Sequence, residues 1–175
     1  MRPAFVTALI AFAFASPSSN AAAQETGAGC ADNSAMLPPE LAGWSSRQPI
    51  MAASDVAGLP AATLAIGSAI DATLKPTADI RYLKRPAKPG GSVDYGGLFD
   101  FTVSRQGTYR VALGSGAWID VLKGKSPVAS TGHGHGPDCS GVRKMVDFPL
   151  TPGRYTLQVA ASGEPMLTLL IAELP

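Results

Sequence analysis

Apolar and polar residues alternate with a period of two along most of the chain after Pro60. The alternating stretches are TLAIGSAIDATL (63–74), DIRYL (79–83), GLFDFTV (97–103), TYRVAL (108–113), WIDVL (118–122), MVDFPL (145–150), RYTLQVA (154–160) and MLTLLIA (166–172). Gly, Pro, Asp and Ser separate them, and no long segment has helical periodicity. This pattern predicts an all-β domain over 61–175, an antiparallel β-sandwich or jelly roll with one packed and one wet face per sheet.

Two parts of this domain repeat each other. FDFTVSRQGTYRVAL, starting at Phe99, aligns with VDFPLTPGRYTLQVA, starting at Val146, with a one-residue gap. The alignment superposes Asp100 on Asp147, Phe101 on Phe148, Gly107 on Gly153 and Tyr109 on Tyr155. Each copy reads as strand, glycine turn and strand, so the repeat predicts two meanders of similar geometry.

The first 60 residues show a different pattern. Residues 1–23 combine Arg2, an apolar run of about a dozen residues and a small-residue end, as in a secretory signal peptide cleaved near Ala23. The run is shorter than the roughly 20 residues that span a bilayer, so no membrane span is expected. Residues 24–60 lack a sustained period and predict an irregular N-terminal arm, which Trp44 anchors to the domain. A periplasmic or secreted location follows from this interpretation.

The charge balance excludes some partners. The chain has 14 Lys plus Arg and 13 Asp plus Glu, and loss of Arg2 with the signal peptide leaves 13 against 13. No block of like charge suits nucleic acid or a membrane surface. The densest basic stretch, RYLKRPAKP (81–89), predicts an extended solvated loop because of its prolines.

The only cysteines, Cys30 and Cys139, form an even pair. In an oxidising compartment such a pair most simply forms a disulfide. Closing a loop of roughly 110 residues would stabilise the fold by about 4 to 5 kcal/mol in the chain-entropy model. This role competes with a role of Cys139 as a metal ligand.

The stretch STGHGHGPDC (130–139) holds both histidines of the chain. In an extended backbone His133 and His135 project from one face and could ligate one ion, with Asp138 or Cys139 as a third ligand. A carboxylate would suit iron, whereas a thiolate would suit copper or zinc. The glycines favour a mobile loop closed by the disulfide instead, in which case the protein holds no cofactor. Both interpretations stay open.

Other candidate sites are weaker. Ser130, His133 and Asp138 could be written as a triad, but no nucleophile elbow precedes a helix. The carboxylates of Asp100 and Asp147 are expected to face solvent. Trp118, with Tyr95, Tyr109 and Tyr155, could form an aromatic platform for a sugar, although the hydroxyls of Tyr109 and Tyr155 also suit bonds to backbone beside the turn glycines.

Residues 60–173 resemble the small secreted bacterial β-sandwich modules of the pre-peptidase C-terminal type. The resemblance lies in F-D-F-x-V…G-x-Y-x-V, V-D-F-x-L…P-G-x-Y-x-L and the closing MLTLLIAEL. PPELAGW, DYGGLFDF, YRVALGSGAWIDV and HGHGPDCSGVRKMVDF also resemble short exported proteins labelled homogentisate 1,2-dioxygenase. That label implies iron held by two histidines and a glutamate. His133 and His135 would be the histidines, but Cys139 or Ser140 stands where the glutamate is expected.

Two functions follow from these features. The first is a non-catalytic exported binding or accessory module for a protein or glycan. The alternative is a small metal-dependent protein, such as a dioxygenase, that holds iron, copper or zinc in the HGHGPDC loop.

Overall fold

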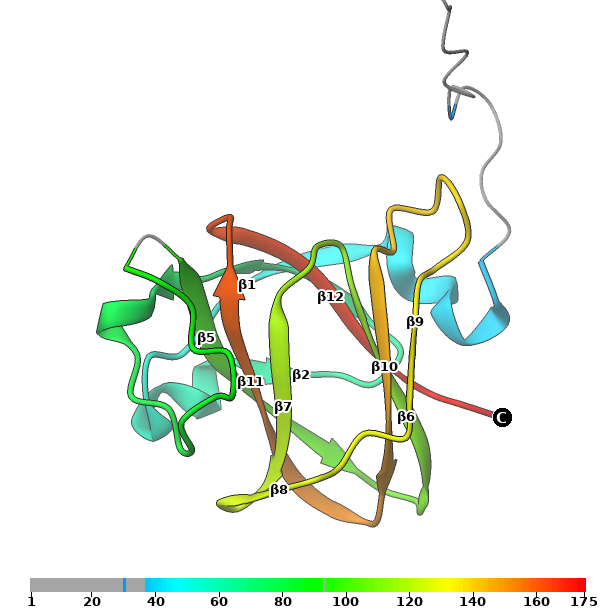
Figure 1. Ribbon diagram of the computed structural model, residues 1–175. Coiled ribbons are helices and arrows are strands. Elements are labelled where there is room, and N and C mark those ends of the chain that lie inside the picture. The colour runs from blue at the N-terminus through cyan, green and yellow to red at the C-terminus, as the bar shows by residue number, and fades with distance from the viewer. Residues whose placement is uncertain (1–29, 31–36, 93) are drawn as a thin grey trace, which may run out of the picture. The chain divides into compact units, whose positions relative to one another are not determined.

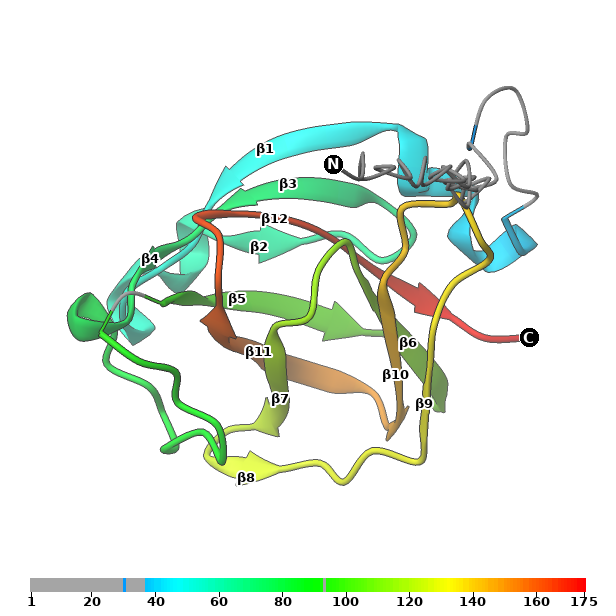
Figure 2. The ribbon, with the colours of Figure 1, turned by 45° about the horizontal axis from the view of Figure 1, so that its top comes forward.

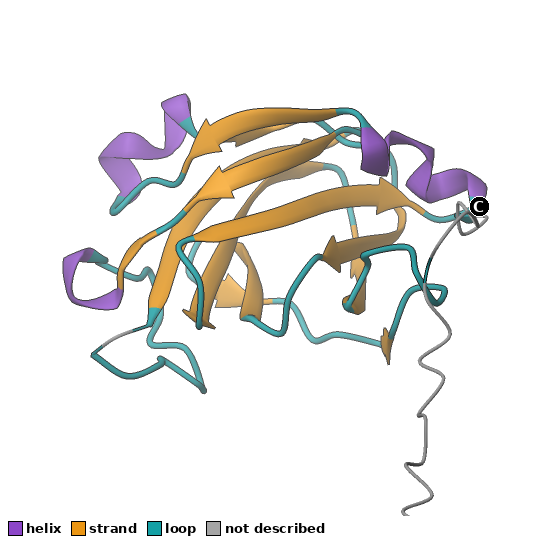
Figure 3. Ribbon diagram, turned by 90° about the horizontal axis from the view of Figure 1, so that it is seen from above, coloured by secondary structure: helices purple, strands orange, loops and turns teal. Residues whose placement is uncertain are grey.

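Twelve strands form two sheets in the computed structural model, which describes Cys30, residues 37–92 and residues 94–175 (Figure 1). Apart from Cys30, the described residues belong to one compact unit, Asp32–Pro175. Sheet A has the strand order β1-β3-β12-β6-β10-β9. Sheet B has the order β2-β5-β11-β7-β8, and β4 pairs with β5. The two sheets lie as layers of a sandwich, with short helical segments at the periphery (Figure 3).

The strands have the following bounds. Sheet A contains β1 (Arg47–Met51), β3 (Ala69–Thr73), β6 (Gly107–Leu113), β9 (Gly132–Gly134), β10 (Lys144–Leu150) and β12 (Met166–Glu173). Sheet B contains β2 (Thr63–Leu64), β4 (Lys75–Pro76), β5 (Tyr95–Val103), β7 (Trp118–Lys123), β8 (Ser126–Pro127) and β11 (Gly153–Ser162). The 3-10 helices are η1 (Pro39–Ser45), η2 (Val56–Ala61) and η3 (Thr77–Asp79).

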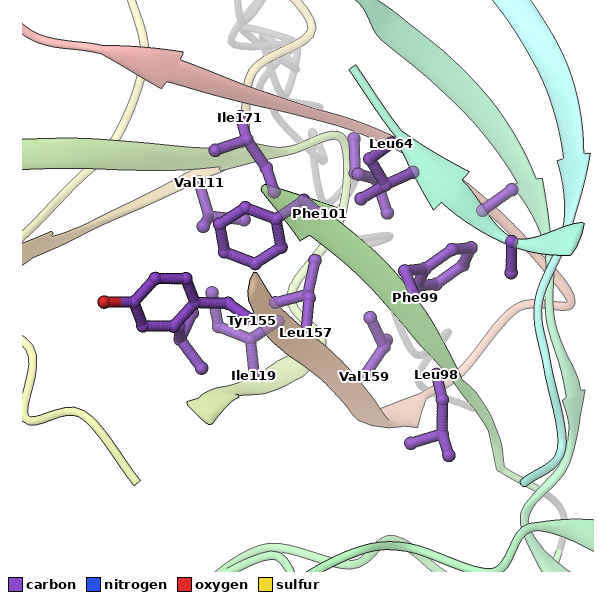
Figure 4. Close-up of a cluster of buried hydrophobic side chains, with 14 of the residues drawn as sticks. Leu64, Leu98, Phe99, Phe101, Val111, Ile119, Tyr155, Leu157, Val159 and Ile171 are labelled. Carbon is purple, nitrogen blue, oxygen red and sulfur yellow. The ribbon is translucent and has the colours of Figure 1, made fainter. Parts of the chain in front are cut away.

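The main core lies between the sheets. Alternate residues of the longer strands, from β5 to β7 and from β10 to β12, point inward, as the sequence pattern predicts, and fill the space between the sheets with aliphatic and aromatic side chains. Figure 4 shows Phe99 and Phe101 of β5 among Leu157 and Val159 of β11. The rings of Phe101 and Tyr155 stack with their centroids 5.6 Å apart. The predicted all-β sandwich is therefore confirmed.

Two features of the sheets differ from the prediction. Most pairings are antiparallel, but β1 pairs with β3 and β2 with β5 in parallel. The stretch 79–83, predicted as a strand, forms the end of η3 and a loop. Its alternation has another cause, because Ile80, Tyr82 and Leu83 pack as partly buried side chains against the core without strand pairing.

The segment predicted as an irregular arm contains regular elements. Its described part, 37–60, includes η1, β1 and most of η2. Trp44 is buried in a second apolar cluster with Leu41 and Leu170, so η1 covers the outer face of sheet A and Trp44 is the predicted anchor. The hydrophobic pattern did not predict β1, because β1 is an edge strand whose residues are mostly exposed. The predicted signal peptide, 1–23, lies outside the described residues.

The internal repeat crosses between the sheets. In the first copy β5, β6 and β7 lie in sheets B, A and B, and in the second copy β10, β11 and β12 lie in sheets A, B and A. The copies are therefore not meanders, because each strand pairs with strands of the other copy. Phe101 lies beside Tyr155 in one sheet, and Phe148 lies beside Tyr109 in the other.

Candidate functional site

The HGHG stretch is ordered by its neighbours. Residues 132–134 form β9, which pairs with β10 at the edge of sheet A. Farther on, the indole N–H of Trp44 donates to the carbonyl of Ser140 at 3.1 Å. Cys139 forms the predicted disulfide with Cys30. The glycine-rich stretch is thus a short edge strand followed by a turn with several fixed points.

The two histidines have separate environments. His135 donates from Nδ1 to the carbonyl of Arg143 at 2.7 Å, which fixes its tautomer because a carbonyl can only accept. His133 lies opposite Val146 in the β9–β10 pairing, and its Nε2 is 3.3 Å from the hydroxyl of Ser130. Asp138 is exposed in the turn.

No group of three or more His, Cys, Asp or Glu side chains arranged to hold a metal ion occurs among the residues that the structure describes. In the candidate catalytic triad, the hydroxyl of Ser130 and the imidazole of His133 are within hydrogen-bond distance. Asp138 does not line the pocket that these two residues share. The ligand set His133, His135 and Asp138 stays a prediction.

A pocket of about 270 Å³ lies at the side of the sandwich where the edge of sheet B faces the edge of sheet A. The segment that runs from β8 to β9 connects these two edges, as Figure 2 shows. We call this hollow the edge pocket. It is lined by Trp118, Ile119, Asp120, Val128, Ala129, Ser130, His133, Lys144, Val146 and Phe148. The lining therefore combines core side chains with one carboxylate, one ammonium group and one indole.

Alternation along β7 explains this mixed lining. Ile119 and Val121 point into the core, so Trp118 and Asp120 point to the other face of sheet B. Trp118 is half-buried, and its indole N–H is inaccessible to solvent and makes no hydrogen bond of good geometry with another described residue. Trp118, a candidate for sugar binding, and His133, a candidate metal ligand, thus line the same pocket.

Two ammonium groups lie over the ring of Trp118. The Nζ atom of Lys88 is 5.6 Å and that of Lys144 is 5.8 Å from the ring centroid, within the range of cation–π attraction. Lys144 also donates to the carbonyl of Ala117 at 2.7 Å. Burial lowers the pKa of Lys144, and the positive charge of Lys88 lowers it further. Neither lysine was predicted as a site residue from the sequence. The two lie 56 residues apart in the chain, and no local pattern shows that they approach the same ring.

Lys88 belongs to the basic stretch 81–89, which is held on sheet B. The side-chain oxygen of Gln158 accepts from the backbone N–H of Leu83 at 2.7 Å, and its nitrogen donates to the carbonyl of Lys84 at 3.0 Å. The hydroxyl of Tyr82 donates to the carbonyl of Val159 at 3.1 Å. We call residues 81–89 the basic loop. It is not a free solvated loop, since the side chains of Gln158 and Tyr82 fix it to β11.

Asp120 is the carboxylate of the edge pocket. Burial raises its pKa, while the indole of Trp118, the charge of Lys84 and the amide of Gln158 oppose this rise. The neighbouring Tyr82 has its pKa raised to about 12 by burial and by the negative charge of Asp120. Burial and these neighbours thus act on the pKa of Asp120 in opposite directions. The carboxylate oxygens of Asp120 can accept hydrogen bonds from a ligand.

The other aromatic candidates do not join this pocket. Tyr109 is 1% exposed, and its hydroxyl donates to the carbonyl of Arg105 at 3.0 Å. Tyr155 is 2% exposed and donates in the same way to the carbonyl of Thr151 at 2.9 Å. The prediction of a surface platform that includes Tyr109 is wrong, because this side chain fills the core. Tyr95 is half-buried against the core at the start of β5.

The equivalent carboxylates Asp100 and Asp147 are both paired with arginine. Asp100 is buried and binds Nε of Arg154 with both oxygens at 2.7 Å. Asp147 accepts two hydrogen bonds from Arg110, at 2.8 and 2.9 Å. The expectation that both face solvent is wrong for Asp100, and the pairs lie in different sheets.

The sequence matches no protein-family model and no curated protein. Within the described residues, no helix is both long and apolar enough to cross a membrane. The fold and the edge pocket are thus the observations on which a function can be based.

Proposed function

We propose that the protein is a non-catalytic binding module that takes a glycan at the edge pocket. The observation that carries this proposal is the half-buried Trp118, which lines a hollow together with Asp120, Lys144 and His133. An indole supplies a flat apolar surface for the ring of a sugar, and the surrounding polar groups can bind its hydroxyls.

The compartment proposed is the periplasm or the extracellular space. The Cys30–Cys139 disulfide indicates an oxidising environment. We assign residues 1–23 to a signal peptide on their sequence pattern. N-terminal sequencing of the exported protein tests this assignment, which predicts Gln24 as the first residue.

The binding function is tested with the full mature chain and a panel of neutral and acidic oligosaccharides. Ligands are added to ¹⁵N-labelled protein, and the backbone shifts of β7 and of residues 128–133 are followed. At least one sugar is expected to shift these signals and to lose its effect in Trp118→Ala. Trp44→Phe, which changes the only other tryptophan, is the matched control.

Two results would contradict a non-catalytic module. One is turnover of a bound sugar into a new product. The other is about one equivalent of iron, copper or zinc in protein purified without chelator or affinity-tag histidines, lost in His133→Ala and His135→Ala. If no oligosaccharide moves the signals of the edge pocket, the binding proposal fails.

A further inference from the structure

The two ammonium groups over the ring of Trp118 form no salt bridge with a described carboxylate. The salt bridges formed between described residues all use arginine: Arg47, Arg105, Arg110 and Arg154. Lys88 and Lys144 pair with no carboxylate in the part of the chain that the structure describes. Their printed contacts are the ring of Trp118 and, for Lys144, one backbone carbonyl.

This arrangement is electrostatically unfavourable without a ligand. Two ammonium groups within 6 Å of one ring centroid repel each other, and Lys144 is also partly removed from water. A cation–π contact at a solvent-exposed site contributes only about 0.5–1 kcal/mol, whereas hydrogen bonds from an ammonium to a carboxylate are stronger. An anionic group on a ligand would therefore draw both lysines into ion pairs.

The remaining lining limits the kind of anion. Asp120 lines the same pocket as Lys144, so a ligand that places more than one negative charge inside the pocket is disfavoured. Asp120, Ser130 and His133 can exchange hydrogen bonds with hydroxyl groups, and Trp118 can stack on a ring. A volume of about 270 Å³ suits a single ring, because it lies just below the range of about 300–1,000 Å³ for pockets that enclose larger ligands.

We propose that the edge pocket binds a uronic-acid residue of an acidic glycan, with Lys88 and Lys144 paired to its carboxylate and Trp118 stacked on its ring. This proposal rests on the proposed binding function and specifies its ligand. The basic loop then has a role in recognition, since its hydrogen bonds to Gln158 and Val159 of β11 bring Lys88 to Trp118.

The test compares three probes by isothermal titration calorimetry on the full mature chain. Trigalacturonate carries the carboxylates, and its full methyl ester keeps the rings and all the sugar hydroxyls without the charge. Benzoate carries a carboxylate on a ring without sugar hydroxyls. Trigalacturonate is expected to bind at least about tenfold more tightly than either other probe, because charge-assisted hydrogen bonds discriminate at this level.

Variants locate the charge effect. Lys88→Gln and Lys144→Gln are each expected to weaken trigalacturonate binding about fivefold to tenfold and to leave the ester unaffected. Lys125→Gln is the matched control, because Lys125, unlike Lys88 and Lys144, is an exposed lysine that neither lies over the ring of Trp118 nor lines the edge pocket. Lys88 is exposed, so its variant reports on binding even if Lys144→Gln alters the fold.

Each contrary outcome has a distinct meaning. If the ester or another neutral sugar binds at the edge pocket as tightly as trigalacturonate, the uronate proposal is overturned and the binding function stands. Equal binding of benzoate overturns the assignment to a sugar. If neither these probes nor the wider panel shifts the edge-pocket signals, both proposals fail.

Discussion

At the residue scale, the two copies of the repeat share a side-chain-to-backbone hydrogen bond. Tyr109 and Tyr155 each follow the turn glycine by two residues and donate to the carbonyl four residues back. This is the geometry of the tyrosine corner known from other β-sandwiches. Tyr155 additionally accepts from the backbone N–H of Thr151 at 3.1 Å. Its hydroxyl thus binds both the N–H and the carbonyl of Thr151.

The Tyr→Phe exchanges are expected to differ in cost. Tyr155→Phe leaves a carbonyl and an N–H without their partner, whereas Tyr109→Phe leaves only a carbonyl. A loss of about 1 kcal/mol is expected for Tyr109→Phe and about 2 kcal/mol for Tyr155→Phe. Urea unfolding of the two variants measures the difference, and an equal or reversed order would contradict it.

A second residue-scale prediction concerns Asp120 and pH. Burial raises the pKa of Asp120 above its ordinary value of 3.8, so the folded protein holds this proton more tightly than the unfolded chain. The contribution of Asp120 to stability therefore falls as pH rises from about 3.8 through the raised pKa, and it stays low above that pKa. The side chain of the Asp120→Asn variant does not titrate, so this pH-dependent contribution is absent from the variant.

The free energy of unfolding of Asp120→Asn relative to the natural protein is thus expected to increase with pH across this window and then to level off. Urea titrations at several values between pH 3 and 7 measure it. A difference that does not change with pH would show that Asp120 has the same pKa in both states.

At the element scale, the alternation of apolar and polar residues predicted the strands that have one packed face. It failed for segments at the surface. β5, β6, β7, β10, β11 and β12 follow the pattern because one face of each is packed. The same alternation misled at 79–83, where Ile80, Tyr82 and Leu83 of a docked loop are partly buried against the core without strand pairing. β1 was missed because both of its faces are largely exposed.

The candidate site was predicted only in part. Trp118 and His133 were identified as unusual residues, and the pairing of Cys30 with Cys139 followed from their number. The approach of Lys88 and Lys144 to Trp118 depends on loop docking and on the placing of two sheet edges. No local sequence pattern encodes these long-range contacts.

Docking of the basic loop requires a residue without a side chain at Gly96 of β5. A Cβ atom there would collide with the hydroxyl oxygen of Tyr82 and with the carbonyl oxygen of Val159. Gly96→Ala is therefore expected to displace Tyr82 and to lower stability by about 1–3 kcal/mol. Faster amide exchange of Leu83 and Lys84, whose N–H groups bind Gln158, is the local readout.

Gly116→Ala is the matched control for this prediction, since its Cβ would meet nothing within 4 Å. If Gly96→Ala keeps the exchange rates of Leu83 and Lys84 unchanged, the loop tolerates the added methyl group and Gly96 has no such role.

At the scale of the whole molecule, the disulfide spans most of the sandwich sequence. It links Cys30 to Cys139 and so closes a loop of roughly 110 residues. Replacing both cysteines by serine is expected to lower the free energy of unfolding by about 2–5 kcal/mol. Urea unfolding with and without reductant measures the loss. Reductant should not affect the double variant, and an effect of equal size there would point to another cause.

The crossed arrangement of the repeat also governs how the chain can fold. The strand nearest the C-terminus, β12, lies inside sheet A between β3 and β6, and β5 and β6 pair with strands that come much later in the sequence. Contacts of such high sequence separation slow folding to milliseconds or longer. Until residues 166–173 are available, sheet A lacks an interior strand. The chain therefore reaches its native state only after its synthesis has delivered β12, and folding during synthesis is confined to earlier, incomplete structures.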